Sequence, residues 1–239
     1  TDAADYLGVY SKMLVKYTDD EDPIILSFVS SGKNVTTTLQ ADAWDDEYYT
    51  NASNDYQEAI DAVFQGNDKG QLWYYSNSDK TGKSTRYYLA DDFKLYVNGV
   101  EVNAKDEDNI RNYIFKNETG TVTLVDTPTE GTSSTDGKYD SIYVSYFGTA
   151  IVESVNSNGK VYFDGFANTK GATYVEFDDD DDDLSYTITL DGKDVKYSDL
   201  QEGDVISIAY DVTQPFDKSN FYDVLVSRNT VEGKITEVN

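Results

Sequence analysis

Alternation of apolar and polar residues, with a period of two, is the feature that most constrains the fold of this chain. Successive side chains of a β-strand point to opposite faces of its sheet, so this alternation is typical of half-buried strands. Tyr, Val, Ile and Thr, which favour strands, fill most of the alternating segments. The alternation therefore predicts a mainly β chain, with strands at 9–17, 24–29, 72–75, 85–89, 93–97, 121–125, 142–147, 151–155, 160–163, 173–177, 186–190, 205–210 and 222–227.

Tight-turn dipeptides separate many of these segments. They are Asn98-Gly99, Asp136-Gly137, Asn158-Gly159 and Asp191-Gly192. Asn-Gly and Asp-Gly supply the positive φ angles that two-residue hairpin turns require, so we expect local, antiparallel connections. The predicted fold class is a set of tandem small antiparallel β-barrel or β-sandwich modules.

Two segments depart from the alternation and predict short helices in the N-terminal half. Apolar residues between 56 and 64 follow helical spacing, with Ser53 or Asn54 as a cap and Gly66 as the end. A weaker helical pattern runs over 106–116. We expect both helices to cover the end of a barrel or sandwich.

The charge of the chain limits its partners. The formal net charge is −26, from 45 acidic and 19 basic residues. Nucleic-acid binding depends on Lys and Arg neutralising phosphates, and anionic membranes attract the same residues, so neither partner is expected. No apolar run is long enough to cross a bilayer, so we predict no membrane insertion.

Many kinds of catalysis are closed to this chain because it contains no Cys and no His. This composition excludes Cys/His zinc sites, nucleophile–histidine triads and thiol redox chemistry. A pair of carboxylates can hydrolyse a glycoside, and composition leaves that route open. No acidic residue lies in a pattern that marks such a pair. We therefore predict a non-catalytic protein with no catalytic or cofactor-binding residues.

The sequence contains an internal repeat. Residues 93–102 resemble 186–195, each pattern reading as strand, two-residue turn and return strand. Residues 139–145 resemble 221–227. A further match joins the segments 149–156 and 232–239.

The repeat predicts a modular organisation. Residues 70–148 form the first β-repeat module, 149–230 the second, and 231–239 begin a further repeat. Residues 1–69, which include the first helix, have no counterpart in the second module. They form either a separate small domain or the first half of a larger one.

Three segments carry a family resemblance. Residues 199–211 (DLQEGDVISIAYD), 221–228 (FYDVLVSR) and 231–238 (VEGKITEV) resemble the β-repeat region of Gram-positive bacterial cell-surface proteins of the S-layer homology domain-containing type. The opening YLG at 6–8 and the later TLQAD at 38–42 are similar to segments of the same proteins. The resemblance implies an exported protein attached to the cell wall or cell surface, and it carries over no catalytic residue.

Runs of acidic residues are the candidate metal sites. Oxygen ligands suit Ca²⁺, which accepts six to eight of them. Consecutive residues of an extended chain point in opposite directions, however, so the alternative is a solvated, self-repelling loop. Asp19–Asp22 and Asp45–Glu47 are shorter acidic turns of the same kind. The main candidate is the run of Asp178, Asp179, Asp180, Asp181, Asp182 and Asp183.

Clustered aromatic residues offer a second route to function, because aromatic rings stack on the apolar faces of sugars. The candidates are 73–75, 87–88 and 48–49, and one residue of each adjacent pair is expected to face the core. The favoured interpretation is a structural or display module whose partners are other surface-protein modules. The alternative is a carbohydrate-binding or adhesin module that recognises cell-wall or host glycans, with calcium as a stabilising ion.

Overall fold

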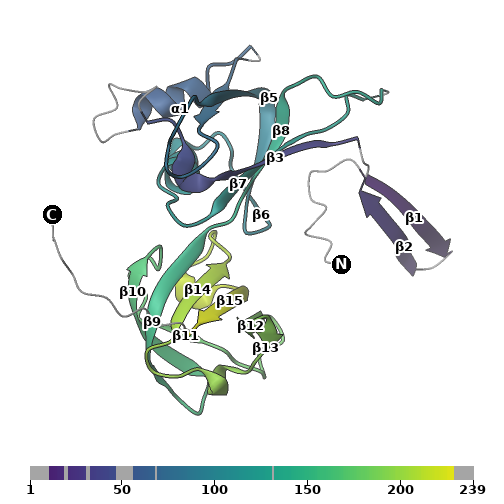
Figure 1. The fold of residues 1–239 in the computed structure, drawn as a ribbon. Helices are drawn as coiled ribbons and strands as arrows, with labels where there is room; N and C mark the ends of the chain where they lie inside the picture. Colours follow the sequence, from purple (N-terminus) through teal and green to yellow (C-terminus); the bar gives the residue numbers. More distant parts are fainter. Residues whose placement is uncertain are drawn as a thin grey trace, which may run out of the picture. The chain divides into compact units, whose positions relative to one another are not determined.

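The structure is a computed structural model that describes residues 11–18, 21–30, 33–46, 56–67, 69–130 and 132–228. The chain divides into two compact units, Thr1–Tyr146 and Phe147–Asn239 (Figure 1). β-strands dominate both units, and the predicted mainly β fold class is confirmed.

The first unit contains two separate sheets. Strands β1 (Ser11–Thr18) and β2 (Glu21–Ser30) form a two-stranded antiparallel ribbon with two shifts of register. The larger sheet has the order β3-β7-β8-β5-β4, with β6 paired to β5. Its strands are β3 (Val35–Gln40), β4 (Gln71–Tyr74), β5 (Thr85–Val97), β6 (Val100–Val102), β7 (Thr121–Asp126) and β8 (Tyr139–Val144).

The larger sheet curls back on itself. Trp44, which follows β3, pairs with Tyr74 at the end of β4, so the two edges of the sheet are bridged. A closed sheet leaves few exposed strand edges. Its interior is filled by fully buried aliphatic residues that include Leu72, Leu89, Leu95, Leu124 and Ile142.

Two short helices complete the first unit, as predicted. Helix α1 (Gln57–Val63) buries Ala59, Ile60 and Val63, and the Phe64 N–H donates to the Ile60 carbonyl at its end. The predicted caps Ser53 and Asn54 lie outside the described residues.

The second helical segment begins as α2 (Glu107–Ile110) and continues as a π-helix, η3 (Arg111–Phe115). The Asp106 side chain caps its start by accepting from the Asp108 N–H at 2.9 Å. The buried residues Ile110 and Ile114 give the apolar face that the spacing predicted. The one-turn 3-10 helix η2 (Ala41–Ala43) lies between β3 and the Trp44 bridge.

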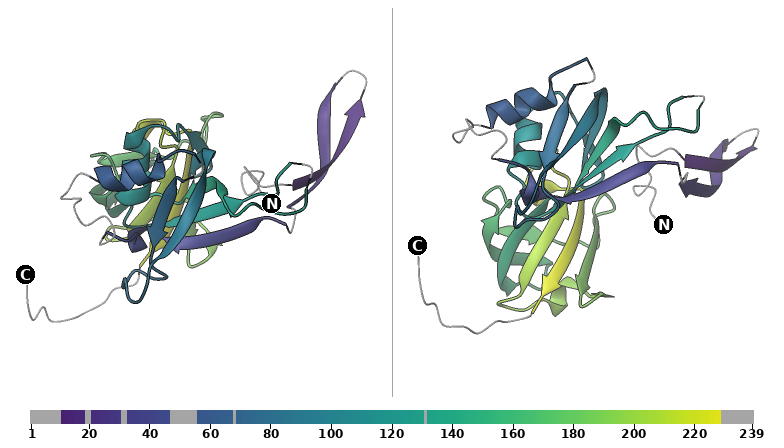
Figure 2. Two further views of the ribbon diagram at one scale, coloured as in Figure 1. Left: turned by 90° about the horizontal axis from the view of Figure 1, so that it is seen from above. Right: turned by 45° about the horizontal axis from the view of Figure 1, so that its top comes forward.

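The second unit is one seven-stranded sheet with the order β11-β10-β9-β14-β15-β12-β13, and its strands curve around a common interior (Figure 2). Two one-turn 3-10 helices, η4 (Tyr197–Asp199) and η5 (Phe216–Lys218), lie in its connections. The strands are β9 (Phe147–Val155), β10 (Lys160–Ala167), β11 (Tyr174–Glu176), β12 (Ser185–Leu190), β13 (Lys193–Asp194), β14 (Val205–Tyr210) and β15 (Phe221–Ser227).

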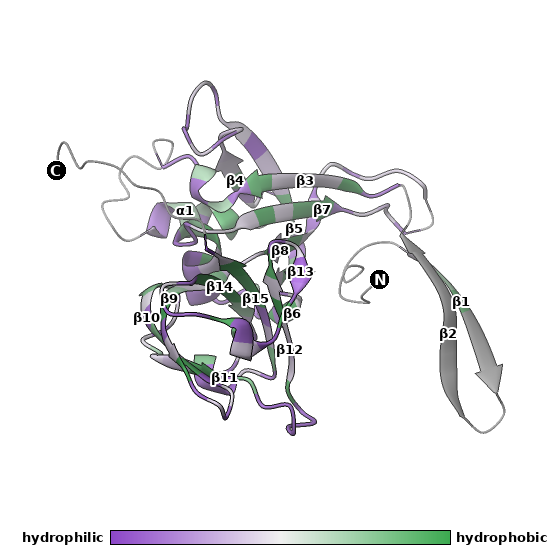
Figure 3. Cartoon of the chain, turned by 60° about the horizontal axis from the view of Figure 1, so that its bottom comes forward, coloured by the Kyte–Doolittle hydropathy of each residue, from purple (hydrophilic) through white to green (hydrophobic). Residues whose placement is uncertain are grey.

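Aromatic rings organise the core of the second unit. Phe216 lies with its ring centroid 4.7 Å from that of Tyr210 and 5.9 Å from that of Phe163, both at edge-on angles. Such edge-to-face pairs contribute about 0.5–1.5 kcal/mol beyond their buried area. Hydrophobic residues concentrate in the strands, and hydrophilic residues in the loops (Figure 3).

The two units pair their strands in the same pattern. In the first unit β8 lies between β7, which is antiparallel to it, and β5, which is parallel. In the second unit β15 lies in the same way between β14 and β12. Leu95 of β5 pairs with Ile142 of β8, and its sequence match Ile188 pairs with Val224 of β15, so the register is also the same.

Two of the four predicted hairpin turns lie at equivalent places in the two units, while at Asp136-Gly137 and Asn158-Gly159 only the glycine has a positive φ angle. Asn98 and Gly99 have φ angles of 50° and 82° between β5 and β6, and Asp191 and Gly192 have φ angles of 52° and 74° between β12 and β13. Positive φ at both central residues is the type I′ geometry that these dipeptides predicted.

Several features of the sheets differ from the predictions. The segments 85–89 and 93–97 form one long strand, β5, and the threonine-rich strand β3 was not predicted. Each unit also contains one parallel strand pair, which local turns do not reveal. Strand β3, from predicted segment 1–69, pairs with β7 from segment 70–148, so both segments contribute to one sheet. The predicted repeat start at 231–239 lies outside the described residues.

Candidate functional site

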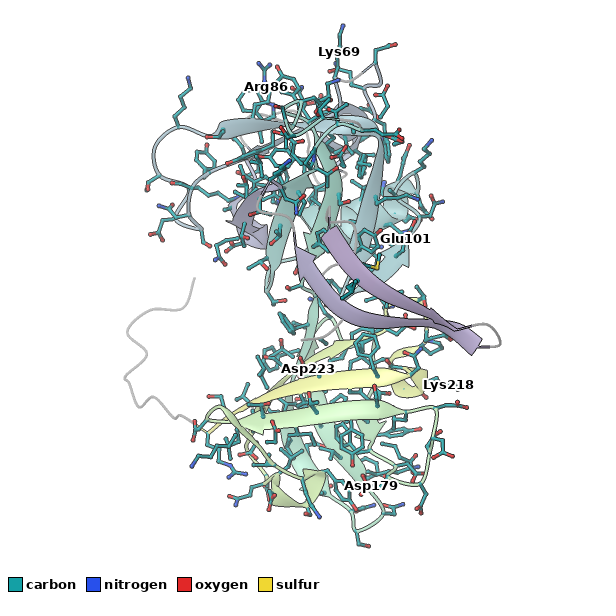
Figure 4. The ribbon with its side chains drawn as sticks, turned by 90° about the vertical axis from the view of Figure 1, so that its right-hand side faces the viewer. Lys69, Arg86, Glu101, Asp179, Lys218 and Asp223 are labelled. Carbon is teal, nitrogen blue, oxygen red and sulfur yellow. The ribbon has the colours of Figure 1, made fainter. Side chains whose placement is uncertain are left out.

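The aspartate run forms the exposed loop between β11 and β12, where Asp179 is labelled in Figure 4. All six carboxylates are exposed. The Asp180 N–H donates to Asp178 Oδ1 at 3.0 Å, and the Asp183 N–H donates to Asp181 Oδ1 at 3.0 Å. These side chains thus stabilise turns in their own loop.

One aspartate of the run also contacts β12. The Tyr186 hydroxyl donates to Asp179 Oδ1, and burial together with this hydrogen bond raises the pKa of Tyr186 above its ordinary value. Within the described ranges, no three acidic side chains come close enough together to hold a metal ion. Calcium binding by Asp178–Asp183 therefore stays a prediction.

The shorter acidic turns are only partly described. Asp45 is buried and accepts a hydrogen bond from the Tyr75 hydroxyl at 3.2 Å, and Asp46 pairs with Lys80 at 2.9 Å. Glu47 and Asp19 lie outside the described residues. The two described carboxylates therefore interact with neighbours in their own unit.

Trp73, Arg86 and Tyr88 form a cluster on the paired strands β4 and β5 of the first unit. The Arg86 guanidinium carbon lies 5.4 Å from the Trp73 ring centroid and 4.5 Å from that of Tyr88, and Figure 4 labels Arg86. Neighbouring Tyr74 is fully buried, as the strand alternation predicted for the pair 73–74, but Tyr75 is buried too, so the alternation does not hold for the pair 74–75. Arg86 therefore lies over one face of each ring in a cation–π arrangement.

Tyr88 is the member of the predicted pair 87–88 that belongs to this cluster, and Tyr87 has a different neighbour. Tyr87 contacts Tyr139 at 5.9 Å between ring centroids, and burial raises the pKa of Tyr87. Tyr48 and Tyr49 lie outside the described residues.

A buried carboxylate that the sequence did not indicate lies where β7 ends. Asp126 is 2% exposed, and its Oδ2 accepts from the Gly137 N–H at 2.9 Å. Its Oδ1 has no hydrogen-bond partner among the described residues. Burial raises the pKa of Asp126, and the nearby carboxylates of Asp136 and Asp140 raise it further against the hydrogen bond from Gly137. Relative to a solvated aspartate, this environment shifts the Asp126 carboxyl toward its protonated form.

The neighbouring carboxylate of Asp140 has its own hydrogen-bond donors. Asp140, on β8, accepts hydrogen bonds from Thr127, whose N–H and hydroxyl both donate to Asp140 Oδ2 at 2.7 Å. Asp126 lines neither the hollow of the second unit around Tyr197 nor the hollow beside α1.

The hollows in the surface are shallow. One of about 570 Å³ in the second unit is open to solvent, and one of about 230 Å³ lies beside α1 in the first unit. The first is lined by Glu153, Ser154, Val155, Asn156, Ser157, Tyr197, Ser198, Leu200 and Glu202.

The end of β15 carries a second feature that the sequence analysis missed. Arg228 donates to the buried Asp204 from Nε to Oδ1 at 2.8 Å and from Nη2 to Oδ2 at 3.0 Å. Burial raises the Asp204 pKa, but the hydrogen bonds from Arg228 and the Gln201 N–H outweigh it, so the pKa lies below its ordinary value. Both residues fall in the segments that carry the family resemblance, which was the available signal.

Known proteins give no parallel from which a role for these residues could be inferred. No helix in the described part of the chain is long and apolar enough to cross a membrane. No family model, no curated protein and no solved structure matches the chain.

Proposed function

We propose that this chain is a non-catalytic structural or display module of an exported bacterial cell-surface protein of the S-layer-like kind. The observation that supports the proposal best is the shared pairing pattern of its two units, in which matched segments have the same strand order and register. Spacer arrays are built from repeated units of this kind.

The two units are copies of one module in this proposal. Each has its own buried core, and each ends on a strand held by an antiparallel partner on one side and a parallel partner on the other. A repeated unit with its own core can be added in series without redesigning its neighbours. Function then resides in length and surface, and other surface-protein modules are the expected partners.

The cell-surface location rests on the family resemblance of segments 199–211 and 221–228. The net charge of −26 suits an exposed, soluble surface and the attraction of cations. Calcium bound by Asp178–Asp183 is part of the same proposal as a stabilising ion.

Independent folding of the second unit tests the modular part. We expect residues 147–230 produced alone to give a cooperative thermal transition and a β-type circular dichroism spectrum. An unfolded fragment would contradict the modular proposal. Antibody labelling of intact cells that produce the protein tests the location, and labelling only after lysis would contradict it.

Carbohydrate binding is the alternative function, and the Trp73–Arg86–Tyr88 cluster is the observation that favours it. A glycan array probed with the intact chain tests this alternative. The double variant Trp73→Ala, Tyr88→Ala should lose any binding, while Tyr162→Ala in the second unit is the control. Equal binding by all three proteins would exclude the cluster as the site, and no binding by the intact chain would leave the structural role.

A further inference from the structure

We propose that each unit is built to resist tension applied along the chain. The strand by which the chain enters the larger sheet of the unit and the last strand of the unit both pair with one central strand, and tension pulls these two strands along it in opposite directions, that is, in shear. This inference rests on the proposed spacer function, since a spacer between a cell wall and an external contact carries tension. It concerns the pairing geometry of β9, β14 and β15 in the second unit, and of β3, β7 and β8 in the first.

In the second unit, β14 is the central strand. Phe147, where β9 begins, pairs with Ala209 near the end of β14. Ser227, where β15 ends, pairs with Val205 at the start of β14. The chain therefore enters and leaves this three-stranded group at opposite ends. Tension along the chain pulls β9 and β15 in opposite directions, parallel to β14.

This direction decides how the hydrogen bonds are loaded. The hydrogen bonds of an antiparallel ladder lie perpendicular to the strands, so a pull along the strands strains all of these bonds at once. A pull that separates two strands from one end breaks the same bonds one after another. Forced unfolding depends on the barrier to unfolding, and shear of a whole ladder raises that barrier.

The first unit repeats this geometry. Val35, where β3 begins, pairs with Asp126 at the end of β7. Val144, where β8 ends, pairs with Val122 near the start of β7. The entering strand β3 and the leaving strand β8 thus lie on either side of the antiparallel strand β7. Tension along the chain pulls them in opposite directions.

Each leaving strand is held by a further ladder. β8 pairs in parallel with β5, and β15 pairs in parallel with β12. The last strand of each unit is thus an interior strand with hydrogen bonds on both edges. Pulling it along its own axis must shear two ladders.

Side chains reinforce the points where tension leaves the units. After β8, Asn98 Nδ2 donates to the Tyr146 carbonyl at 2.8 Å, and the Tyr146 N–H donates to Asn98 Oδ1 at 2.9 Å. Asn117 Nδ2 donates to the Ser145 carbonyl at 2.9 Å. After β15, Arg228 holds Asp204, whose carbonyl accepts from the Val152 N–H of β9 at 2.8 Å. The clamp therefore connects the leaving residue with the strand by which the chain enters.

Single-molecule pulling between chosen residues tests the proposal. Since the chain has no Cys, two introduced cysteines define the pulling points uniquely. The intact chain with Thr149→Cys and Ser227→Cys is pulled in shear. The matched chain with Thr149→Cys and Gln214→Cys is pulled at one end of the β9–β14 ladder, because Gln214 follows the end of β14. We expect a several-fold higher unfolding force for the first pair at the same loading rate.

Equal unfolding forces for the two cysteine pairs would overturn the proposal. A lower unfolding force for the Thr149/Ser227 pair than for the Thr149/Gln214 pair would also overturn it. Adding Arg228→Met should lower the force of the shear pair and leave that of the peeling pair unchanged. Thermal melts first establish that each variant is folded. If the second-unit variants do not fold, the pairs Val35→Cys/Ser145→Cys and Val35→Cys/Thr129→Cys give the same comparison in the first unit, because Ser145 follows the end of β8 and Thr129 follows the end of β7.

These outcomes are distinct from failure of the proposed function. A chain absent from the cell surface can still show the force difference, and a surface module can lack it. Labelling of intact cells therefore tests the proposed function, and the ratio of the two unfolding forces tests the mechanical proposal.

Discussion

Asp204 and Arg228 form a two-pronged ion pair, with N–O distances of 2.8 and 3.0 Å, that fastens the end of β15 to the loop before β14. The Arg228 Nη2 group also donates to the Asp199 carbonyl. Asp204 is 3% exposed, so its charge depends on this partner and on the Gln201 N–H, which donates at 2.8 Å.

Removing the guanidinium should destabilise the second unit. Arg228→Met leaves Asp204 buried without its cation, so we expect a lower melting temperature for the transition of this unit. Lys218→Met, which removes a charge from an exposed position of the same unit, is the control. Equal melting temperatures for Arg228→Met and the unchanged protein, measured by calorimetry, would show that the pair contributes nothing to stability.

The same pair predicts a loss of stability in acid. The pKa of Asp204 is lower in the folded than in the unfolded state, so its contribution is present above the unfolded pKa, about 3.9. The contribution is lost as the pH falls through the folded pKa. Melting temperatures recorded across this acid range should fall less steeply for Asp204→Asn than for the unchanged protein. Parallel curves would contradict the linkage.

Asp126 predicts the opposite dependence. Its pKa is raised by burial, so the folded state favours the protonated carboxyl and this contribution is complete below about pH 3.9. It is lost as the pH rises through the folded pKa. Asp126→Asn keeps an acceptor for the Gly137 N–H and removes the charge, so we expect a higher melting temperature at pH 7. Glu118→Gln, at an exposed position of the same unit, is the control, and a destabilised Asp126→Asn protein would show that the carboxylate has a stabilising partner.

The hairpin glycine of each unit should contribute to the stability of that unit. Gly99 and Gly192 have φ angles of 82° and 74°, which a Cβ atom disfavours. Gly99→Ala and Gly192→Ala should each lower the stability by about 1 kcal/mol or more. Lys193→Ala, beside Gly192, should have little effect. Denaturant unfolding curves that are unchanged in both glycine variants would contradict the turn geometry.

Calcium should stabilise the second unit if the aspartate run binds it. We expect millimolar CaCl₂ to raise the melting temperature of the chain and EDTA to reverse the rise. The double variant Asp179→Asn, Asp181→Asn should abolish the effect, while Asp164→Asn on β10 should not. A melting temperature that does not respond to calcium in the unchanged chain would remove calcium from the proposed function.

The sequence by itself determined the local structure of this protein. Alternation placed most strands within a few residues of their bounds, as for β12 and β14, and the dipeptides Asn98-Gly99 and Asp191-Gly192 determined two tight turns. Both signals are local, since strand alternation and positive φ angles depend on neighbouring residues. The matched segments 93–102 and 186–195 also indicated units that pair their strands alike.

Only the tertiary structure decided which distant segments lie side by side. The parallel pairs β5–β8 and β12–β15 join strands far apart in the chain, and no local pattern specifies them. Strand β3 was missed because its exposed threonines hide its pairing with β7. Burial of Asp126 and the clamp between Asp204 and Arg228 are also products of packing. The sequence alone does not distinguish a solvated carboxylate from a buried one. The surroundings in the folded protein set the pKa of the carboxylate and its hydrogen-bond partner.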